Sequence, residues 1–396
     1  MLKIVNKIKI KICVVAISLG LSLCANSAVI NHVELTVEEL RIDKALKSLP
    51  NVAFRLSARV DDFASQLNKA TNYTVLTQLV IRHGKGLWLD QKKSFNQLND
   101  FDDRPLYWAR LQMSKALRTA KAFGELFPNQ QRKLLWTFEL LSRGQKDVKF
   151  DKKADKKILL TGFDPFFLDR HIDQSNPSGV VALSLDDLVV SIEGQTAEIE
   201  VLILPVRFAD FDQGMIEELL APYIQNKSVD MVLTISMGRE NFDLERFPAL
   251  RRSANAPDNL NVLTGATKNN PLVPKLNNSA LQGPEFVEFS LPISAMLKGA
   301  GKYQVNDNRT ISTLSGGTFN GQALTDIVKQ TSVSGSGGGY LSNEISYRSI
   351  LLRDQYNLTL PVGHIHTPKI KAFDQQALMN IVNQTKSIIT QGVADL

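Results

Sequence analysis

Three segments in the C-terminal half of the chain supply groups of types that support hydrolysis: a carboxylate in residues 239–246, the hydroxyl of Ser342 and a histidine in residues 362–368. A hydroxyl attacks a carbonyl carbon when a neighbouring imidazole takes its proton, and a carboxylate can orient that imidazole. Ser342 follows a glycine-rich stretch, residues 335–339, and could begin a helix. Unpaired N–H groups at a helix start can stabilise an oxyanion. These residues therefore predict a nucleophilic site, although small residues near a helix start are more often simple caps.

A second histidine, His364, lies two residues before His366. Residues two apart on a strand face the same side, so we expect both imidazoles to face the site. The pair could assist a serine or bind a metal ion. The sequence offers no third ligand at a spacing typical of metal sites, so we expect neither a metal nor a cofactor.

The order of several motifs resembles the pyroglutamyl peptidase I family, cysteine peptidases that remove an N-terminal pyroglutamate. The resemblance runs from about residue 158 to about residue 380. It is carried by residues 158–166, 176–178, 204–206, 239–246, 257–259, 283–284, 289–293, 338–343 and 363–368. It implies Ser342 as nucleophile, His366 as general base and acid, and Glu245 as orienting carboxylate. The family's nucleophile is Cys, and this chain has Ser342 in its place.

The resemblance also implies an apolar slot for a lactam ring and a peptide with an N-terminal pyroglutamate as substrate. The residues at the matching positions are Phe163, Phe166, Asn255, Tyr340 and Leu341. Asn255 stands where the family has an arginine, and it could donate a hydrogen bond without the charge. A serine attacks less readily than a thiolate. The alternative is therefore a catalytically inactive homologue that binds blocked peptide N-termini.

Strands and helices alternate from residue 158 onward. Apolar runs predict strands over 158–161, 198–205 and 231–236, and a helical period appears over 215–224. This pattern predicts a three-layer α/β/α domain with an open, mostly parallel sheet, over residues 158–396. Sites in such folds gather at the carboxyl ends of strands, here the turns after Thr161 and Ser236. Residues 297–338 have the composition of an insertion or a lengthened loop.

Residues 1–28 have the pattern of a secretory signal peptide, with lysines, an apolar run over 12–23 and small residues before the cleavage point. The apolar run is short for a membrane span, so we expect a periplasmic or secreted protein; a retained anchor and lipidation at Cys24 are the alternatives. Both cysteines lie in this segment. The net charge of +6 includes four of its lysines, so the charge gives no reason to expect a nucleic-acid partner. The sequence leaves the oligomeric state open.

Residues 29–145 lie outside the resemblance and predict a helical N-terminal domain, followed by a charged linker over 146–157. A capping box at Thr36–Glu39 predicts a first helix with Leu40 in its apolar series. Asp103 and Pro105 predict a long helix that reaches Leu126, and Asn129 predicts the cap of a third.

The three tryptophans, Trp88, Trp108 and Trp136, all fall in this region, which suggests that it has its own core. Residues 82–86, with two glycines, have the composition of a surface turn. An alternative to enzymatic activity is that this region carries the function by docking to a partner.

Overall fold

The structure, a computed structural model, describes residues 34–98, 101–150 and 153–396. The predicted signal peptide, residues 1–28, lies outside the described residues. Among the helices of the described ranges, none combines the length and the apolar character that a membrane crossing requires.

The described part of residues 34–150 is helical, as predicted. Its helices are α1 (Val37–Leu40), α2 (Ile42–Ser48), α3 (Pro50–Ala53), α4 (Ser57–Leu67), α5 (Tyr73–Leu98), α6 (Arg104–Thr119), α7 (Lys121–Gly124) and α8 (Pro128–Leu141). The capping box forms, because Thr36 Oγ1 accepts from the Glu39 amide and the Glu39 carboxylate accepts from the Thr36 amide. Leu40, however, is 65% exposed and ends α1, so its predicted inward position is wrong.

Two other helix boundaries differ from the prediction. The helix expected to reach Leu126 ends at Thr119, where Ala120 takes an extended conformation. Asn129 does not cap the next helix, because Pro128 already occupies the first helical position. A proline suits that position since its missing N–H would have no partner there.

The predicted surface turn at residues 82–86 is wrong, because these residues lie inside α5. His83 is buried, and its ring centroid lies 5.1 Å from that of Phe63. A Cβ atom placed on Gly84 would lie 3.0 Å from Leu141 Cβ on α8. The glycine therefore allows two helices to approach closely, a use that composition alone does not distinguish from a turn.

The C-terminal part is built on a seven-stranded sheet. Its strands are β1 (Lys156–Phe163), β2 (Leu188–Ile192), β3 (Gln195–Leu204), β4 (Met231–Met237), β5 (Phe242–Glu245), β8 (Val305–Asn308) and β12 (Val362–Thr367). Their order is β2-β3-β1-β4-β12-β5-β8, and only the β2–β3 and β12–β5 pairs are antiparallel. The prediction of a mostly parallel sheet is confirmed. The predicted strands 158–161 and 231–236 lie within β1 and β4, and β3 contains the third except for Pro205.

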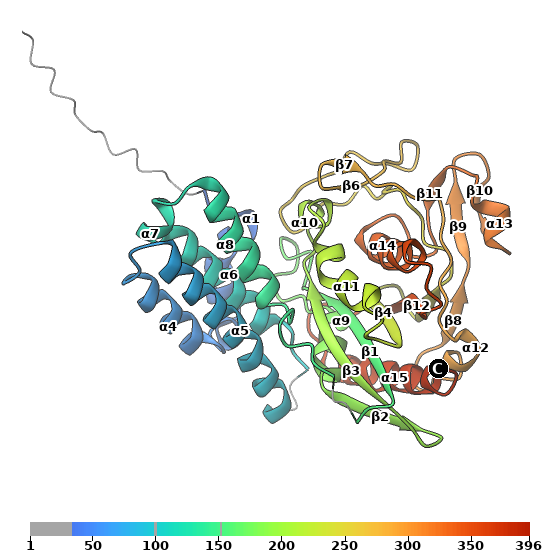
Figure 1. The fold of residues 1–396 in the computed structure, drawn as a ribbon, viewed down its shortest axis with the longest axis horizontal. Coiled ribbons are helices and arrows are strands. Elements are labelled where there is room, and N and C mark those ends of the chain that lie inside the picture. Colours follow the sequence, from blue (N-terminus) through green and yellow to red (C-terminus); the bar gives the residue numbers. More distant parts are fainter. Residues whose placement is uncertain (1–33, 99–100, 151–152) are drawn as a thin grey trace, which may run out of the picture. The chain divides into compact units, whose positions relative to one another are not determined.

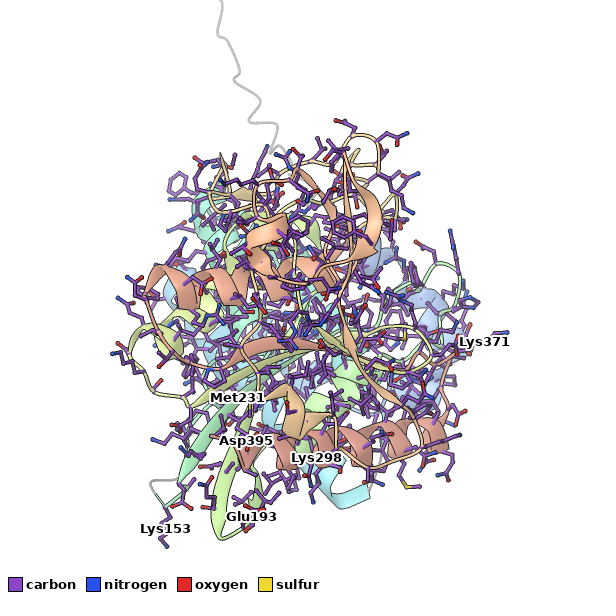
Figure 2. All side chains as sticks on the ribbon, turned by 90° about the vertical axis from the view of Figure 1, so that its right-hand side faces the viewer. Lys153, Glu193, Met231, Lys298, Lys371 and Asp395 are labelled. Carbon is purple, nitrogen blue, oxygen red and sulfur yellow. The ribbon has the colours of Figure 1, made fainter. Side chains whose placement is uncertain are left out.

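Helices flank this sheet (Figure 1). The main ones are α9 (Pro177–Leu185), α11 (Met215–Gln225), α14 (Leu341–Gln355) and α15 (Gln375–Val393). Helix α9 packs on β1 and α15, whereas α14 packs on β12 and α11. Residues Ile158–Phe163 of β1 are buried without alternation, as expected for a strand covered on both faces. Met231 on β4 is buried, whereas Glu193, in the β2–β3 turn, is exposed and lies at the lower edge of the molecule in Figure 2.

The predicted insertion, residues 297–338, contributes its own elements. It supplies β8 to the edge of the main sheet and a separate three-stranded sheet in the order β10-β9-β11. The elements of this sheet and its helix are β9 (Thr310–Thr313), β10 (Gly317–Asn320), β11 (Ser332–Ser334) and α13 (Leu324–Ile327). The remaining short elements are α10 (Phe208–Asp212), β6 (Lys275–Leu276), β7 (Ser279–Ala280) and α12 (Ile293–Met296).

The helical part and the sheet share a hydrophobic core. One cluster of buried apolar side chains contains Phe63, Trp88 and Phe138 from the helices together with Leu160 and Val232 from the sheet. The interpretation that the helical region has a core of its own is therefore only partly right. A smaller cluster around Trp108 consists mostly of helical residues but also includes Leu168 of the C-terminal part.

Candidate active site

A cavity of about 540 Å³ opens at the carboxyl ends of β1 and β4. This is where parallel sheets usually hold their sites. Apolar side chains form most of its wall: Phe163, Phe166, Phe167, Val206, Tyr340, Leu341 and Ile370. Polar groups among them include Gln174, Asn176, Ser236 and Ser342. Lys371 lies at the rim, and its side chain extends outward in Figure 2. A mostly apolar cavity with a few polar groups is typical of small-ligand sites.

Glu245 and His366 meet in a buried pair. His366 Nδ1 lies 2.6 Å from Glu245 Oε1. Glu245 is fully buried at the end of β5, and His366 is 7% exposed on the neighbouring strand β12. A carboxylate only accepts hydrogen bonds, so Nδ1 carries a proton, and Nε2 keeps a lone pair in the neutral tautomer of the ring. The arrangement leaves His366 with the nitrogen that a general base needs.

The structure adds Asn308, which sequence reasoning missed. Asn308 on β8 donates through Nδ2 to Glu245 Oε2 at 2.9 Å and to Ser336 O at 3.0 Å. The amide therefore holds the second oxygen of the carboxylate whose first oxygen faces His366. Asn308 lies in the insertion, and no motif there pointed to it. Only the pairing of β8 with β5, which sets Asn308 opposite Glu245, reveals its role.

Ser342 lies at the second position of α14, after the glycine-rich turn, as predicted. Its hydroxyl donates to Gly337 O at 3.2 Å. A Cβ atom on Gly337 would lie 3.6 Å from His366 Cε1, so the serine and the imidazole both adjoin Gly337. Among the hydrogen bonds of the described residues, none joins Ser342 to His366. The structure thus brings nucleophile and base candidates to one glycine without a direct hydrogen bond between them.

The start of α14 is fixed by buried polar contacts. Asn343 Nδ2 donates to Ala249 O at 2.7 Å, and its Oδ1 accepts from the Ala249 amide at 2.9 Å. The next residue, Glu344, accepts from Arg252 at 2.6 Å and from Arg348 at 2.9 Å. The two guanidinium groups hold the pKa of the Glu344 carboxyl below its usual value despite burial, which acts to raise it. The first helical turn is therefore presented to the cavity in a defined position.

Four of the five predicted substrate-binding residues line the cavity: Phe163, Phe166, Tyr340 and Leu341. The Tyr340 hydroxyl donates to Pro257 O at 2.8 Å, which fixes the ring. Asn255 is exposed and is not among the lining residues. The structure does not bring its amide to the cavity.

His364 lies beside His366, with ring centroids 4.8 Å apart and the planes nearly perpendicular. Unlike His366, it has two hydroxyl partners from β4. Thr234 Oγ1 lies 2.8 Å from Nδ1, and Ser236 Oγ lies 2.7 Å from Nε2. Burial, with a contribution from His366, lowers the pKa of His364 well below its usual value. His364 is therefore neutral at ordinary pH, and Ser236, not His364, lines the cavity.

The helical part holds one wall of the cavity. Asp103, next to α6, accepts from Ser175 Oγ at 2.5 Å and from the Asn176 amide at 3.0 Å. Arg110 of α6 donates to Asp164 at 2.8 Å. Burial raises the pKa of Asp103 to about 8. Since Asn176 lines the cavity, the helices contribute directly to its shape.

One acidic group in the described residues has the geometry of a metal site, and it lies away from the cavity. It consists of Asp186, Asp187 and Glu200. The Lys92 ammonium already lies 2.8 Å from each of the two aspartates. Burial raises the pKa of Glu200 to about 9, so this carboxyl is protonated at neutral pH and is a poor ligand. The two aspartates form ion pairs with Lys92, and Asp187 among them is exposed.

The structure is thus that of an α/β/α protein, joined to a helical N-terminal part, whose cavity is lined by Ser342 but not by Glu245 or His366. The Glu245–His366 pair lies behind Gly337, the glycine whose carbonyl accepts from Ser342. Residues 22–139 match the family described as PA0049 N-terminal domain, and residues 157–290 and 320–371 match PA0049, C-terminal domain. Each domain model matches less than half of the chain, and together they cover most of it.

The chain is similar to the uncharacterized protein PA0049 of Pseudomonas aeruginosa. The two are 28% identical over 389 residues, an alignment that covers 75% of this chain and 70% of the relative. Solved structures that it resembles include a mutant pyrrolidone carboxyl peptidase from the hyperthermophile Pyrococcus furiosus (21% identity, 61% of this chain, 99% of that chain, TM-score 0.41). The structure of that peptidase with its Cys-free mutant gives 20% identity, 60% and 99% coverage, and the same TM-score. These values carry no information about activity.

Proposed function

We propose that the cavity is the active site of an exported hydrolase that removes an N-terminal pyroglutamyl, or similar, residue from peptides. Ser342 acts as nucleophile, His366 as general base and acid, and Glu245 as the carboxylate that orients His366. The observation that carries the proposal is the 2.6 Å contact of His366 Nδ1 with a fully buried carboxylate. In the neutral imidazole this contact leaves Nε2 as the free acceptor, and the ring adjoins the glycine that also contacts Ser342.

The proposed reaction begins when the Ser342 hydroxyl turns from Gly337 O towards His366. As Oγ bonds to the substrate carbonyl carbon, Nε2 takes the hydroxyl proton and Glu245 stabilises the imidazolium. Unpaired N–H groups of the first turn of α14 stabilise the oxyanion. The C–N bond then breaks, and His366 gives its proton to the leaving amine. Water, deprotonated by His366, releases the acyl group and restores the serine.

The choice of a pyroglutamyl substrate rests on the motif order that resembles pyroglutamyl peptidase I and on the apolar cavity. Phe163, Phe166 and Leu341 offer a surface that suits a small ring. Export rests on the signal-peptide pattern of residues 1–28. Fractionation of cells that produce the protein tests export, and protein found only in the cytoplasm would contradict export.

The test is hydrolysis of a pyroglutamyl chromogenic amide by the full chain. The variants are Ser342→Ala, Ser342→Cys and, as matched control, Ser346→Ala. Ser346 lies one turn further along the same helix, and its hydroxyl has no hydrogen-bond partner in the structure. We expect Ser342→Ala to lose at least about 100-fold in kcat, since proton transfer and covalent attack are both lost. Ser346→Ala should keep the parental rate. Equal rates for the parent and Ser342→Ala would remove Ser342 from the mechanism.

A binding function is the second candidate, favoured by one observation. The Ser342 hydroxyl donates to a backbone carbonyl and not to His366. In this case the cavity holds a blocked peptide N-terminus without cutting it. Calorimetry would then show tight binding of a pyroglutamyl peptide that mass spectrometry recovers unchanged. Turnover by Ser342→Cys with none by the parent would identify such a chain as a disabled enzyme.

A further inference from the structure

A row of hydrogen bonds connects the sheet interior to the cavity through His364. It begins at Gly363 O, passes through Thr234 Oγ1 and the His364 ring, and ends at Ser236 Oγ. Parallel pairing of β4 with β12 sets Thr234 beside His364 and Ser236 beside His366. The proposed reaction uses His366 but none of the groups in this row. Ser236 is nevertheless part of the cavity wall, together with Ser342.

The direction of these hydrogen bonds follows from counting protons. Thr234 has one hydroxyl proton and donates it to Gly363 O at 3.2 Å, so it accepts from His364 Nδ1. A neutral imidazole has a single N–H, which leaves Nε2 as an acceptor. Ser236 therefore donates its only proton to His364 Nε2 at 2.7 Å. Ser236 Oγ therefore has lone pairs, but no proton, available for a hydrogen bond with a ligand.

The neutral state of His364 keeps this direction fixed. The side chain is fully buried, and burial lowers its pKa well below the usual value. Its Nδ1 partner is a neutral hydroxyl, which cannot balance an imidazolium as a carboxylate would. His364 is therefore a poor base for activating Ser236 as a nucleophile. It is suited to hold the hydroxyl in one orientation.

We propose that Ser236 is a specificity-determining residue that accepts a hydrogen bond from an N–H group of the ligand. The ligand class is a small cyclic amide, whose ring N–H meets Ser236 while its apolar carbons meet the phenylalanines of the cavity. The identity of the ring as a lactam rests on the proposed function. The acceptor character of Ser236 rests only on the hydrogen bonds around His364.

The first experiment determines the protonated nitrogen of His364 by NMR of the full chain labelled with ¹⁵N-histidine. His364→Gln assigns the signal among the five histidines of the chain. We expect a proton on Nδ1, none on Nε2, and the same pattern from weakly acidic to weakly alkaline pH. A proton on Nε2 would make Ser236 a donor towards the cavity and would overturn the proposal. This readout requires neither ligand nor activity.

The second experiment compares two ring compounds that differ in one group, 2-pyrrolidone with a ring N–H and cyclopentanone with CH₂ in its place. Both are titrated by NMR into the parent, Ser236→Ala and Ser342→Ala. We expect the parent to prefer the lactam by about five-fold, as one hydrogen bond predicts. The preference should disappear in Ser236→Ala and remain in Ser342→Ala, the same substitution on the other serine of the cavity.

The outcomes separate this inference from the proposed function. Absence of a lactam preference in the parent, or its persistence in Ser236→Ala, would overturn the role of Ser236 even if the peptide amide is hydrolysed. The expected preference without hydrolysis would leave the role of Ser236 intact and contradict the hydrolase. Failure of 2-pyrrolidone to bind at all would overturn the cyclic-amide ligand class.

Discussion

The two histidines of β12 lie two residues apart on one face of one strand, yet their surroundings differ. Nδ1 of His366 faces the Glu245 carboxylate at 2.6 Å, and the ring adjoins the turn that contacts Ser342. Nδ1 of His364 faces the Thr234 hydroxyl at 2.8 Å, and its other nitrogen faces Ser236. A carboxylate stabilises an imidazolium, whereas a neutral hydroxyl in a buried site does not.

The comparison teaches that the partner of Nδ1 decides what a buried histidine does. His366 can take and return a proton because the resulting charge is paired. His364 stays neutral and serves as a fixed acceptor. One strand thus carries a proton-transfer group and an orienting group side by side behind the cavity wall, which contains neither imidazole. Each of the following predictions tests whether this division of roles holds.

The largest expected effect comes from Glu245→Gln. The glutamine amide would donate to His366 Nδ1 and move the imidazole proton to Nε2, which then cannot act as base. We expect kcat for a pyroglutamyl amide to fall about 10²- to 10⁴-fold, the usual contribution of a general base. The matched change on the other histidine, Thr234→Val, should alter kcat by less than about three-fold because His364 transfers no proton. Similar losses of kcat in both variants would show that the two histidines do not differ in their roles.

A smaller loss is expected from Gly238→Ala. A Cβ atom at this position would lie 2.6 Å from His366 Cβ and 2.9 Å from Cγ, so the imidazole must shift. We expect a fall of about 10- to 100-fold in kcat, since small displacements of catalytic groups are costly. Gly124→Ala on α7, where no atom lies within 4 Å of the added Cβ, is the control. A parental kcat for Gly238→Ala would show that the position of His366 does not matter.

The smallest effect concerns stability and pH at His364. The lowered pKa means that the unfolded chain binds a proton below about pH 6.5 that the folded chain does not bind. The folded state therefore loses stability as pH falls below that value, by at most about 1.4 kcal/mol per pH unit from this group.

His364→Gln should remove that part of the slope in denaturant unfolding measured between about pH 5 and 7. His171→Gln, which changes an exposed histidine, should leave it unchanged. An unchanged slope in His364→Gln would mean that His364 is charged in the folded state.

Much of the fold was predictable because its signals are local. The apolar runs that became β1, β3 and β4 and the helical period of α11 needed no knowledge of distant contacts. Helix α5 was missed at residues 82–86 because Gly84 and Gly86 favour turns in isolation. In the fold, Gly84 serves the close packing of α5 against α8, and such tertiary contacts override local propensity.

The site was predictable only where residues belong to motifs. The sequence predicted Glu245, Ser342 and His366 as a group, and the structure places Glu245 against His366 and Ser342 beside the same glycine. The contribution of Asn308 and Ser236 depends on which strands pair, β8 with β5 and β4 with β12. Strand pairing joins segments that are far apart in the chain, so local residue spacing does not predict it.

Asp103 connects the helical part to the cavity wall through hydrogen bonds. Its carboxyl is kept protonated at neutral pH by burial. It forms hydrogen bonds with the Ser175 hydroxyl and with the Asn176 backbone amide. Its pKa of about 8 lies above the unfolded value, so its stabilising effect is complete only in acid and declines as pH rises towards 8. Alkaline medium would place a buried negative charge between the helices and the sheet, so the cavity wall that Asn176 forms should loosen at high pH.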